Sequence, residues 1–125
     1  MSHKTNSVNW FEIPVNDLQR AKKFYEHVLQ VELHEENMGP MHMAWFPHEQ
    51  NATGAGGTLV KGPGFVPSHQ GTLVYFTVPS IEDAVTRLSA KGGRLLMPKM
   101  SIGQWGFIAN FEDCEGNRVA LHEMK

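Results

Sequence analysis

The two halves of this 125-residue sequence repeat one pattern of strand, cap and helix. Apolar and polar residues alternate over 10–15, and apolar residues then recur at helical spacing over 18–30. The same succession begins again at 73–78. An offset of 63 residues superimposes the two strands and also the two helix caps, Asp17 and Ser80. A single offset that preserves strand, cap and helix together indicates an internal duplication, so we expect two similar modules.

Short strand-like segments separated by turns follow each helix, so each module has the order β-α-β-β-β. The segment 62–68, dense in Gly and Pro, connects the modules. The sequence therefore predicts an α+β fold. We expect a single domain over 1–125 in which modules of about 8–61 and 72–124 form a cupped mixed sheet with the helices on its convex side. The strands expected after the helices span 32–36, 41–46, 57–61, 94–97, 105–111 and 118–123.

The charge pattern narrows the classes of partner. Eleven basic and 13 acidic side chains give a net charge of −2, and no block of like charge appears. This balance argues against a nucleic-acid partner, because phosphate-tracking surfaces are strongly basic. No apolar stretch is long enough to span a bilayer, and the first residues lack the apolar core of a signal peptide, so no membrane partner is expected.

The chain has one cysteine, Cys114, which cannot form an internal disulfide. A reducing cytoplasm is therefore the expected location. Asp113 and Glu115 flank this thiol in a predicted turn, and their charges oppose formation of the thiolate. Cys114 is accordingly interpreted as a tolerated turn residue and not as a nucleophile.

Paired βαβββ modules with these motifs resemble the vicinal-oxygen-chelate superfamily, which includes glyoxalase I, bleomycin-resistance proteins, extradiol dioxygenases and fosfomycin-resistance enzymes. The resemblance covers about 8–124. It rests on the opening run FEIPVND-LQRAKKFYEHVL and on the closing hairpin NFEDCEGNRVAL. The Phe-Glu-Ile-Pro strand and the later Pro-Lys-Met segment (98–100) resemble a glyoxalase-like subgroup without a settled activity. Membership implies a small-molecule ligand in the cup and a homodimer.

The resemblance also implies where a metal ion would bind. Metal-dependent members hold a divalent ion with four inward-facing side chains, and these positions fall on Trp10, near Gly57, on Leu73 and on Ala120. None of these residues supplies the imidazole, carboxylate or thiolate that such ions require. We therefore predict no metal ligands and no cofactor at the usual place, and a divalent metal only at a non-standard site.

Strand alternation indicates which side chains point into the cup. If the apolar residues at 11, 13 and 15 pack against the helices, Trp10 and Glu12 face the cup. The same rule adds Tyr75 and His122 from the second module, and Trp105 supplies further aromatic lining. These five residues form the predicted ligand pocket.

Glu12 and His122 each lie two residues beyond an implied metal-ligand position. A carboxylate and an imidazole in an apolar cup are a candidate catalytic acid–base pair, or two ligands of a displaced metal. Other interpretations stay open, because Glu12 can instead pair with Arg118 or a backbone donor, and His122 can be solvated near the terminus.

Two functions compete at this point. The first is a binding protein that has lost the metal ligands and holds a small apolar or aromatic molecule in the sheet cavity. The alternative is a lyase or isomerase of the same fold that uses Glu12 as general base, with or without a displaced divalent metal.

Overall fold

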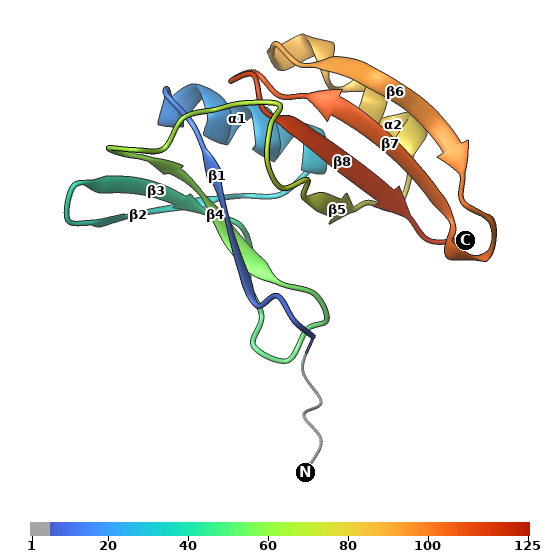
Figure 1. Cartoon of the computed structure of the whole chain (residues 1–125), viewed down its shortest axis with the longest axis horizontal. Coiled ribbons are helices and arrows are strands. Elements are labelled where there is room, and N and C mark those ends of the chain that lie inside the picture. The colour runs from blue at the N-terminus through green and yellow to red at the C-terminus, as the bar shows by residue number, and fades with distance from the viewer. Residues whose placement is uncertain (1–5) are drawn as a thin grey trace.

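The computed structural model describes residues 6–125 and contains two four-stranded mixed sheets (Figure 1). In each sheet the first strand is parallel to its neighbour and the other pairs are antiparallel, as expected for two βαβββ modules. The predicted α+β class and modular plan are therefore confirmed. The first sheet has the order β1 (Trp10–Pro14), β4 (Gly56–Lys61), β3 (Met41–Trp45) and β2 (His34–Met38). The second has the order β5 (Tyr75–Thr77), β8 (Arg118–Glu123), β7 (Phe107–Glu112) and β6 (Arg94–Ser101).

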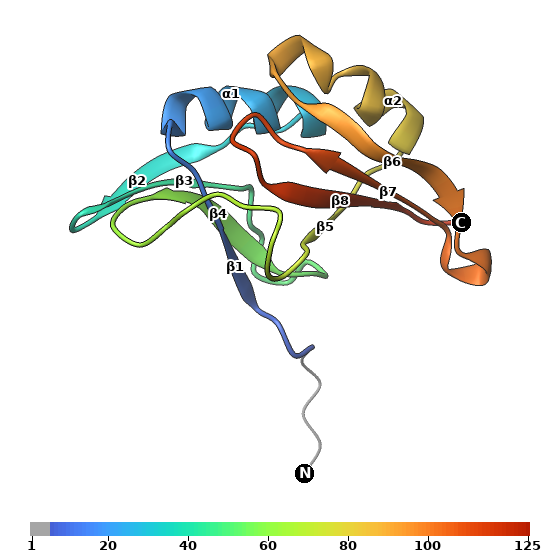
Figure 2. The same ribbon diagram turned by 45° about the horizontal axis from the view of Figure 1, so that its top comes forward.

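Two helices cover one side of the sheets (Figure 2). The helix α1 (Leu18–Leu29) begins where the Asp17 carboxylate accepts the backbone N–H of Arg20 at 3.1 Å, and it ends at Gln30 with φ 57°. The helix α2 (Ile81–Thr86) begins in the same way at the Ser80 hydroxyl. Two short 3₁₀ helices, η1 (Ser89–Lys91) and η2 (Gly103–Trp105), precede β6 and β7.

One continuous core joins the two modules beneath the helices. Tyr25 of α1 is fully buried, and its ring centroid lies 5.6 Å from Phe46, 5.8 Å from Phe76 and 6.5 Å from Phe111. The first of these rings belongs to module one and the other two to module two. Burial of aromatic surface at this junction therefore stabilises both modules together.

A hairpin over 113–117 of module two also binds the start of α1. The Glu115 carboxylate accepts hydrogen bonds from the backbone N–H groups of Asn16 and Asp17 and pairs with the Arg20 guanidinium. An anion at a helix N-terminus is favoured by the free N–H groups there. The acidic hairpin therefore helps to join the two modules. Part of the family resemblance rests on this same hairpin.

Most element boundaries shift by one or two residues from the sequence prediction, and the differences with a structural consequence are these. The strand β2 begins at His34 and not at 32, and β5 has three residues where six were expected. The strand β6 continues through Pro98 to Ser101, because it lies at a sheet edge, where the missing proline N–H leaves no ladder bond unmade. Trp105 lies in η2 and not in a strand, because Gly103 and Gly106 adopt positive φ on either side of it.

Candidate functional site

The strand register places a row of side chains on the face of the first sheet that points away from the helices. Phe11 and Ile13 pack against the helix-side core, which leaves Glu12 on the opposite face. Glu12 lies beside Thr58 of β4, and Thr58 lies beside Trp45 of β3. Cross-strand partners share one face, so these three side chains form one row across the sheet.

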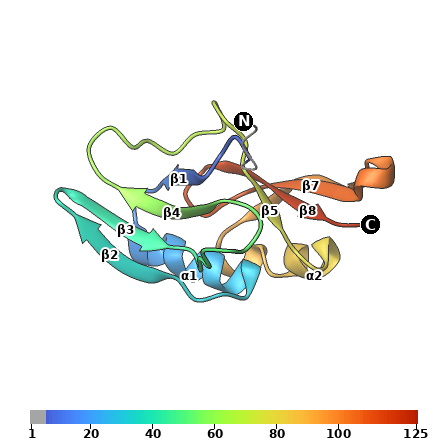
Figure 3. The ribbon, with the colours of Figure 1, turned by 90° about the horizontal axis from the view of Figure 1, so that it is seen from below.

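A cleft of about 500 Å³ opens beside this row, between β1 and the segment that leads into β5. Figure 3 shows the course of these two strands in the backbone. We call it the β1–β5 cleft. Trp10 is held in its wall by an edge-to-face contact with Trp45, with ring centroids 4.9 Å apart. Tyr75, which is 48% exposed, and Leu73 approach from module two. The full lining is Val8, Trp10, Phe11, Glu12, Ala55, Thr72, Leu73, Val74 and Tyr75.

Two polar atoms next to this cleft lack hydrogen-bond partners. The Trp45 Nε1–H group and the Thr58 hydroxyl are buried, and neither meets an acceptor or donor among the described residues. A buried polar group without a partner costs about 1–3 kcal/mol. The first sheet therefore holds two unsatisfied polar groups behind the residues that line the cleft.

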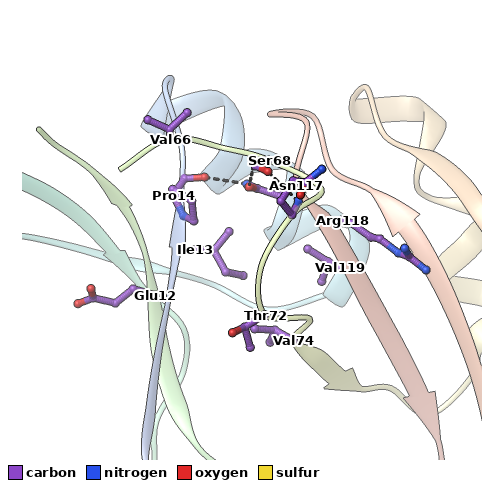
Figure 4. A pocket seen from close by; sticks show the side chains of 11 residues that line it. Glu12, Ile13, Pro14, Val66, Ser68, Thr72, Val74, Asn117, Arg118 and Val119 are labelled. Carbon is purple, nitrogen blue, oxygen red and sulfur yellow. Dashed lines mark hydrogen bonds between the residues drawn. The ribbon is translucent and has the colours of Figure 1, made fainter. Parts of the chain in front are cut away.

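The Glu12 carboxylate is exposed at the edge of the β1–β5 cleft. None of the hydrogen bonds and ion pairs found within residues 6–125 involves it. It does not pair with Arg118. Figure 4 shows the two side chains pointing to opposite sides, and the Arg118 guanidinium lies 3.0 Å from the Asn110 amide oxygen when that amide is oriented to accept from it.

The structure does not bring His122 and Trp105 into the β1–β5 cleft. The His122 Nε2 atom lies 2.7 Å from the backbone oxygen of Trp105, and the Trp105 ring is 68% exposed. Neither residue is among those that line the β1–β5 cleft. The structure therefore groups Trp10, Glu12 and Tyr75, and places the other two predicted residues together at another part of the second sheet.

A smaller cleft of about 190 Å³, the linker cleft, lies between β1, the connecting segment and β8 (Figure 4). The Asn117 side chain fills its end, donating to the Pro14 oxygen at 2.7 Å and accepting from the Ser68 N–H at 3.0 Å. The groups at this end are therefore already hydrogen-bonded within the protein, and a ligand gains little there.

A third opening, the seam cavity of about 310 Å³, was not predicted from the sequence. It lies where the loop before β4 meets β5, and three aromatic rings form its floor: Phe11, Phe46 and Phe76. A signal for it existed in the glycine run at the start of β4. A Cβ on Gly57 would lie 2.4 Å from the Phe11 ring, so only glycine leaves room for that ring.

The residues at the implied metal-ligand positions do not fit a divalent ion. The Val15 N–H donates to the Val60 oxygen, and the Val78 N–H donates to the His122 oxygen, each at 2.9 Å. Because Val15 and Val78 are equivalent in the duplication, Val60 and His122 are equivalent too. The position in β4 equivalent to Ala120 is therefore Thr58, next to Gly57. The four positions thus carry an indole, a neutral hydroxyl, a leucine side chain and a methyl group, which do not form a donor set for such an ion. Residues 6–125 contain no cluster of three or more His, Cys, Asp or Glu side chains arranged to hold a metal.

The Cys114 thiol is a poor nucleophile in this structure. Partial burial, followed by the charges of Asp113 and Glu115, raises its pKa to about 12. The flanking carboxylates act in the direction expected from the sequence, but burial is the larger cause.

Comparison with known proteins places this geometry in a family. The profile of the glyoxalase/bleomycin resistance protein/dioxygenase superfamily matches residues 7–121. The chain belongs to that superfamily. No curated protein sequence matches it. Across residues 6–125, no helix has the length and apolar character needed to cross a membrane.

Solved structures support the same fold. A glyoxalase/bleomycin resistance/dioxygenase domain from Frankia sp. EAN1pec is 17% identical, with 98% of this chain and 100% of that chain covered and a TM-score of 0.71. TnmS3, an antibiotic-binding protein from Streptomyces sp. CB03234, is 23% identical, with coverage of 99% and 100% and a TM-score of 0.64. Glyoxalase I from Zea mays is 19% identical with a TM-score of 0.64, covering 91% of this chain but only 44% of its own. This chain therefore spans less than half of the maize enzyme.

Proposed function

We propose that this protein binds a small, flat and largely apolar organic molecule in the β1–β5 cleft, without a metal ion. The observation that carries the proposal is the composition of the cleft. An indole, a phenol and a leucine side chain converge there around one carboxylate, which is the pattern of a small-molecule site with an apolar body and few polar groups. TnmS3, which has a similar fold, is an antibiotic-binding protein, and this supports an organic small molecule as the ligand.

Each lining residue has a distinct part in this proposal. Trp10 and Tyr75 contact the flat face of the ligand, and Glu12 anchors a cationic or hydrogen-bond-donating group. His122 and Trp105 remain candidates for the pocket only if the ligand extends along the second sheet.

A fluorescence titration with acridine orange, a flat aromatic cation, tests the proposal. We expect saturable binding, and a loss of at least about tenfold in affinity for Tyr75→Ala, because an aromatic contact surface is removed. Glu12→Gln should weaken this cation several-fold and leave a neutral flat probe such as anthracene methanol unaffected. Absence of saturable binding of both probes would overturn the proposal.

Trp105→Ala serves as the matched aromatic variant. The Trp105 ring is exposed and lies outside the cleft, so its removal should change the affinity less than twofold. A loss as large as that of Tyr75→Ala would show that the pocket includes Trp105 and His122, as the sequence predicted.

A second candidate function is a lyase or isomerase reaction with Glu12 as general base. The exposed carboxylate, free of the hydrogen bonds and ion pairs found within residues 6–125, favours it. Proton abstraction next to a carbonyl can be followed as deuterium exchange of a bound ketone in heavy water. Exchange that is catalysed by the wild-type protein and lost in Glu12→Gln would support the enzyme, whereas equal exchange in both would reject Glu12 as the base.

Metal binding and assembly need separate tests. Calorimetric titration of chelator-treated protein with Ni²⁺, Zn²⁺, Mn²⁺ and Fe²⁺ should give no stoichiometric binding. Tight binding lost in Glu12→Gln and His122→Ala would instead reveal a displaced site. We further propose a homodimer, as implied by the family, and a reducing cytoplasm, because the single Cys114 has no partner within the chain. Sedimentation velocity measures the first of these two properties.

A further inference from the structure

The linker cleft and the seam cavity occupy equivalent places in the two modules. The linker cleft lies between residues 12–14 and 117–119, and the seam cavity has equivalent walls at 75–77 and around Ala55. Gly54 and Gly116, 62 residues apart in the two equivalent connections, both have φ 90°. The internal duplication thus creates two equivalent clefts, each between the first strand of one module and the last connection of the other.

The two clefts differ in what fills them. In module two the end of the cleft is occupied by the Asn117 side chain, which is hydrogen-bonded on both sides. The equivalent position in module one is Ala55, whose methyl group leaves this space open. The floor beneath it is aromatic, with the Phe11 and Phe76 ring centroids 5.6 Å apart and those of Phe46 and Phe76 5.1 Å apart.

The seam cavity also borders the β1–β5 cleft. Phe11, Ala55 and Tyr75 line both openings. No strand pairing joins β1 to β5, since each belongs to a different sheet. Only side chains therefore separate the two openings, because no hydrogen-bonded ladder runs between them. Tyr75, which is 48% exposed, lies at their boundary.

We propose that the ligand site runs through this seam and takes an elongated amphiphilic molecule: a flat polar head lies in the β1–β5 cleft and an apolar tail enters the seam cavity. This inference rests on the proposed binding function and adds the class of ligand. Three aromatic rings form the floor of the seam cavity, whereas the Glu12 carboxylate lines the β1–β5 cleft, on the side of the head. An apolar tail in contact with such a floor gains affinity with each methylene removed from water.

Acridine orange and its N-alkyl homologues of increasing chain length test this inference. For the wild-type protein we expect affinity to rise about three- to fourfold per methylene until the tail fills the cavity. Thr53→Trp places a large ring on a residue that lines the seam cavity but not the β1–β5 cleft. In that variant the parent dye should bind as in the wild type, and the gain with chain length should disappear.

Ala52→Trp is the matched control, because this exposed neighbour in the same loop lines neither opening. It should retain the gain with chain length. Nuclear Overhauser contacts between the terminal methyl group of the tail and the Phe46 and Phe76 rings provide a second measurement. A chain-length gain that persists in Thr53→Trp without these contacts would overturn the inference.

The remaining outcomes separate this inference from the proposed function. If the parent dye binds in a Tyr75-dependent way but longer chains bring no gain, the seam inference fails and the binding function stands. If neither the parent dye nor its homologues bind, both fail.

Discussion

The hairpin over 113–117 and the loop over 47–55 hold equivalent places in the two modules but make opposite use of them. In the hairpin, Asp113 is buried and accepts from the Tyr25 hydroxyl at 2.6 Å and from the backbone N–H groups of Glu115 and Asn117 at 2.9 Å. The loop is exposed along its length, and the residue equivalent to this carboxylate is Asn51. Of these two equivalent connections, one joins the modules through buried hydrogen bonds and the other is exposed beside the seam cavity.

This difference explains how the two modules can be held together at the hairpin while the loop stays open beside the proposed ligand site. Buried, satisfied polar networks hold one arrangement strongly, because each lost partner leaves another buried group unpaired. Binding loops, by contrast, are drawn from regions with few such contacts. The comparison predicts that equivalent substitutions in the two turns have unequal effects.

Removing the central carboxylate should have the largest effect. Asp113→Ala leaves the buried Tyr25 hydroxyl and several N–H donors without an acceptor, so we expect the free energy of unfolding to fall by about 3–5 kcal/mol. Chemical denaturation monitored by circular dichroism measures this change. Asn51→Ala, the equivalent substitution in the exposed loop, should cost less than about 0.5 kcal/mol. Equal losses would show that the two turns are not used differently.

The next largest difference is in the reactivity of a thiol placed at the equivalent positions 52 and 114. At pH 8 the thiolate fraction of Cys114, whose pKa is about 12, is over a thousandfold smaller than that of an ordinary exposed cysteine. The higher nucleophilicity of a high-pKa thiolate offsets part of this, so we expect alkylation by iodoacetamide to be about fiftyfold slower than for Ala52→Cys in a Cys114→Ala background.

The pH dependence separates these two thiols further. Because the folded protein raises the pKa of Cys114, its alkylation rate should still rise about tenfold per unit between pH 8 and 10, where the exposed cysteine levels off. Mass spectrometry of quenched samples follows both rates. A plateau near pH 9 for Cys114 would contradict the assigned environment.

Exchanging the residues that fill or open the clefts should have a moderate effect. Asn117→Ala removes the side-chain bonds to Pro14, Ser68 and Asp113 and should lower the free energy of unfolding by about 2 kcal/mol. Ala55→Asn introduces the module-two residue into the exposed loop, and its stability should change by less than about 0.5 kcal/mol. Thermal unfolding of both variants measures the pair. A stabilising Ala55→Asn would mean that the loop closes over the seam as the hairpin does.

Much of the fold was accessible from the sequence, because hydrophobic periodicity, helix caps and the repeat all reflect local rules. Alternation in the first strand correctly placed Phe11 on the helix side and Glu12 opposite it. The length of β6 was predicted wrongly. This strand continues past Pro98 because it lies at the sheet edge, and its position in the sheet follows only from the assembled fold.

The site was less accessible, because a cleft depends on which turns meet across the two sheets. Alternation predicted that Trp10, Glu12, Tyr75 and His122 share one pocket, and the first three line the β1–β5 cleft whereas His122 does not. Nothing in the local pattern showed that Thr58 and Trp45 complete their row, since that depends on the pairing of three strands. The seam cavity was hidden for the same reason, and only the glycines at the start of β4 hinted at a close approach.

The smallest expected difference in stability is between substitutions of the two positive-φ glycines. Gly54 and Gly116 both have φ 90°, and a Cβ on either would meet no atom within 4 Å. Substitution by Ala therefore strains the backbone without a clash, at a cost of about 1–2 kcal/mol at each position. We expect Gly54→Ala and Gly116→Ala to lower the free energy of unfolding equally within about 0.5 kcal/mol, as measured by urea denaturation. The cost arises from the local turn conformation and not from the surroundings. A loss confined to Gly116→Ala would show that the loop over 47–55 can leave its turn conformation at little cost.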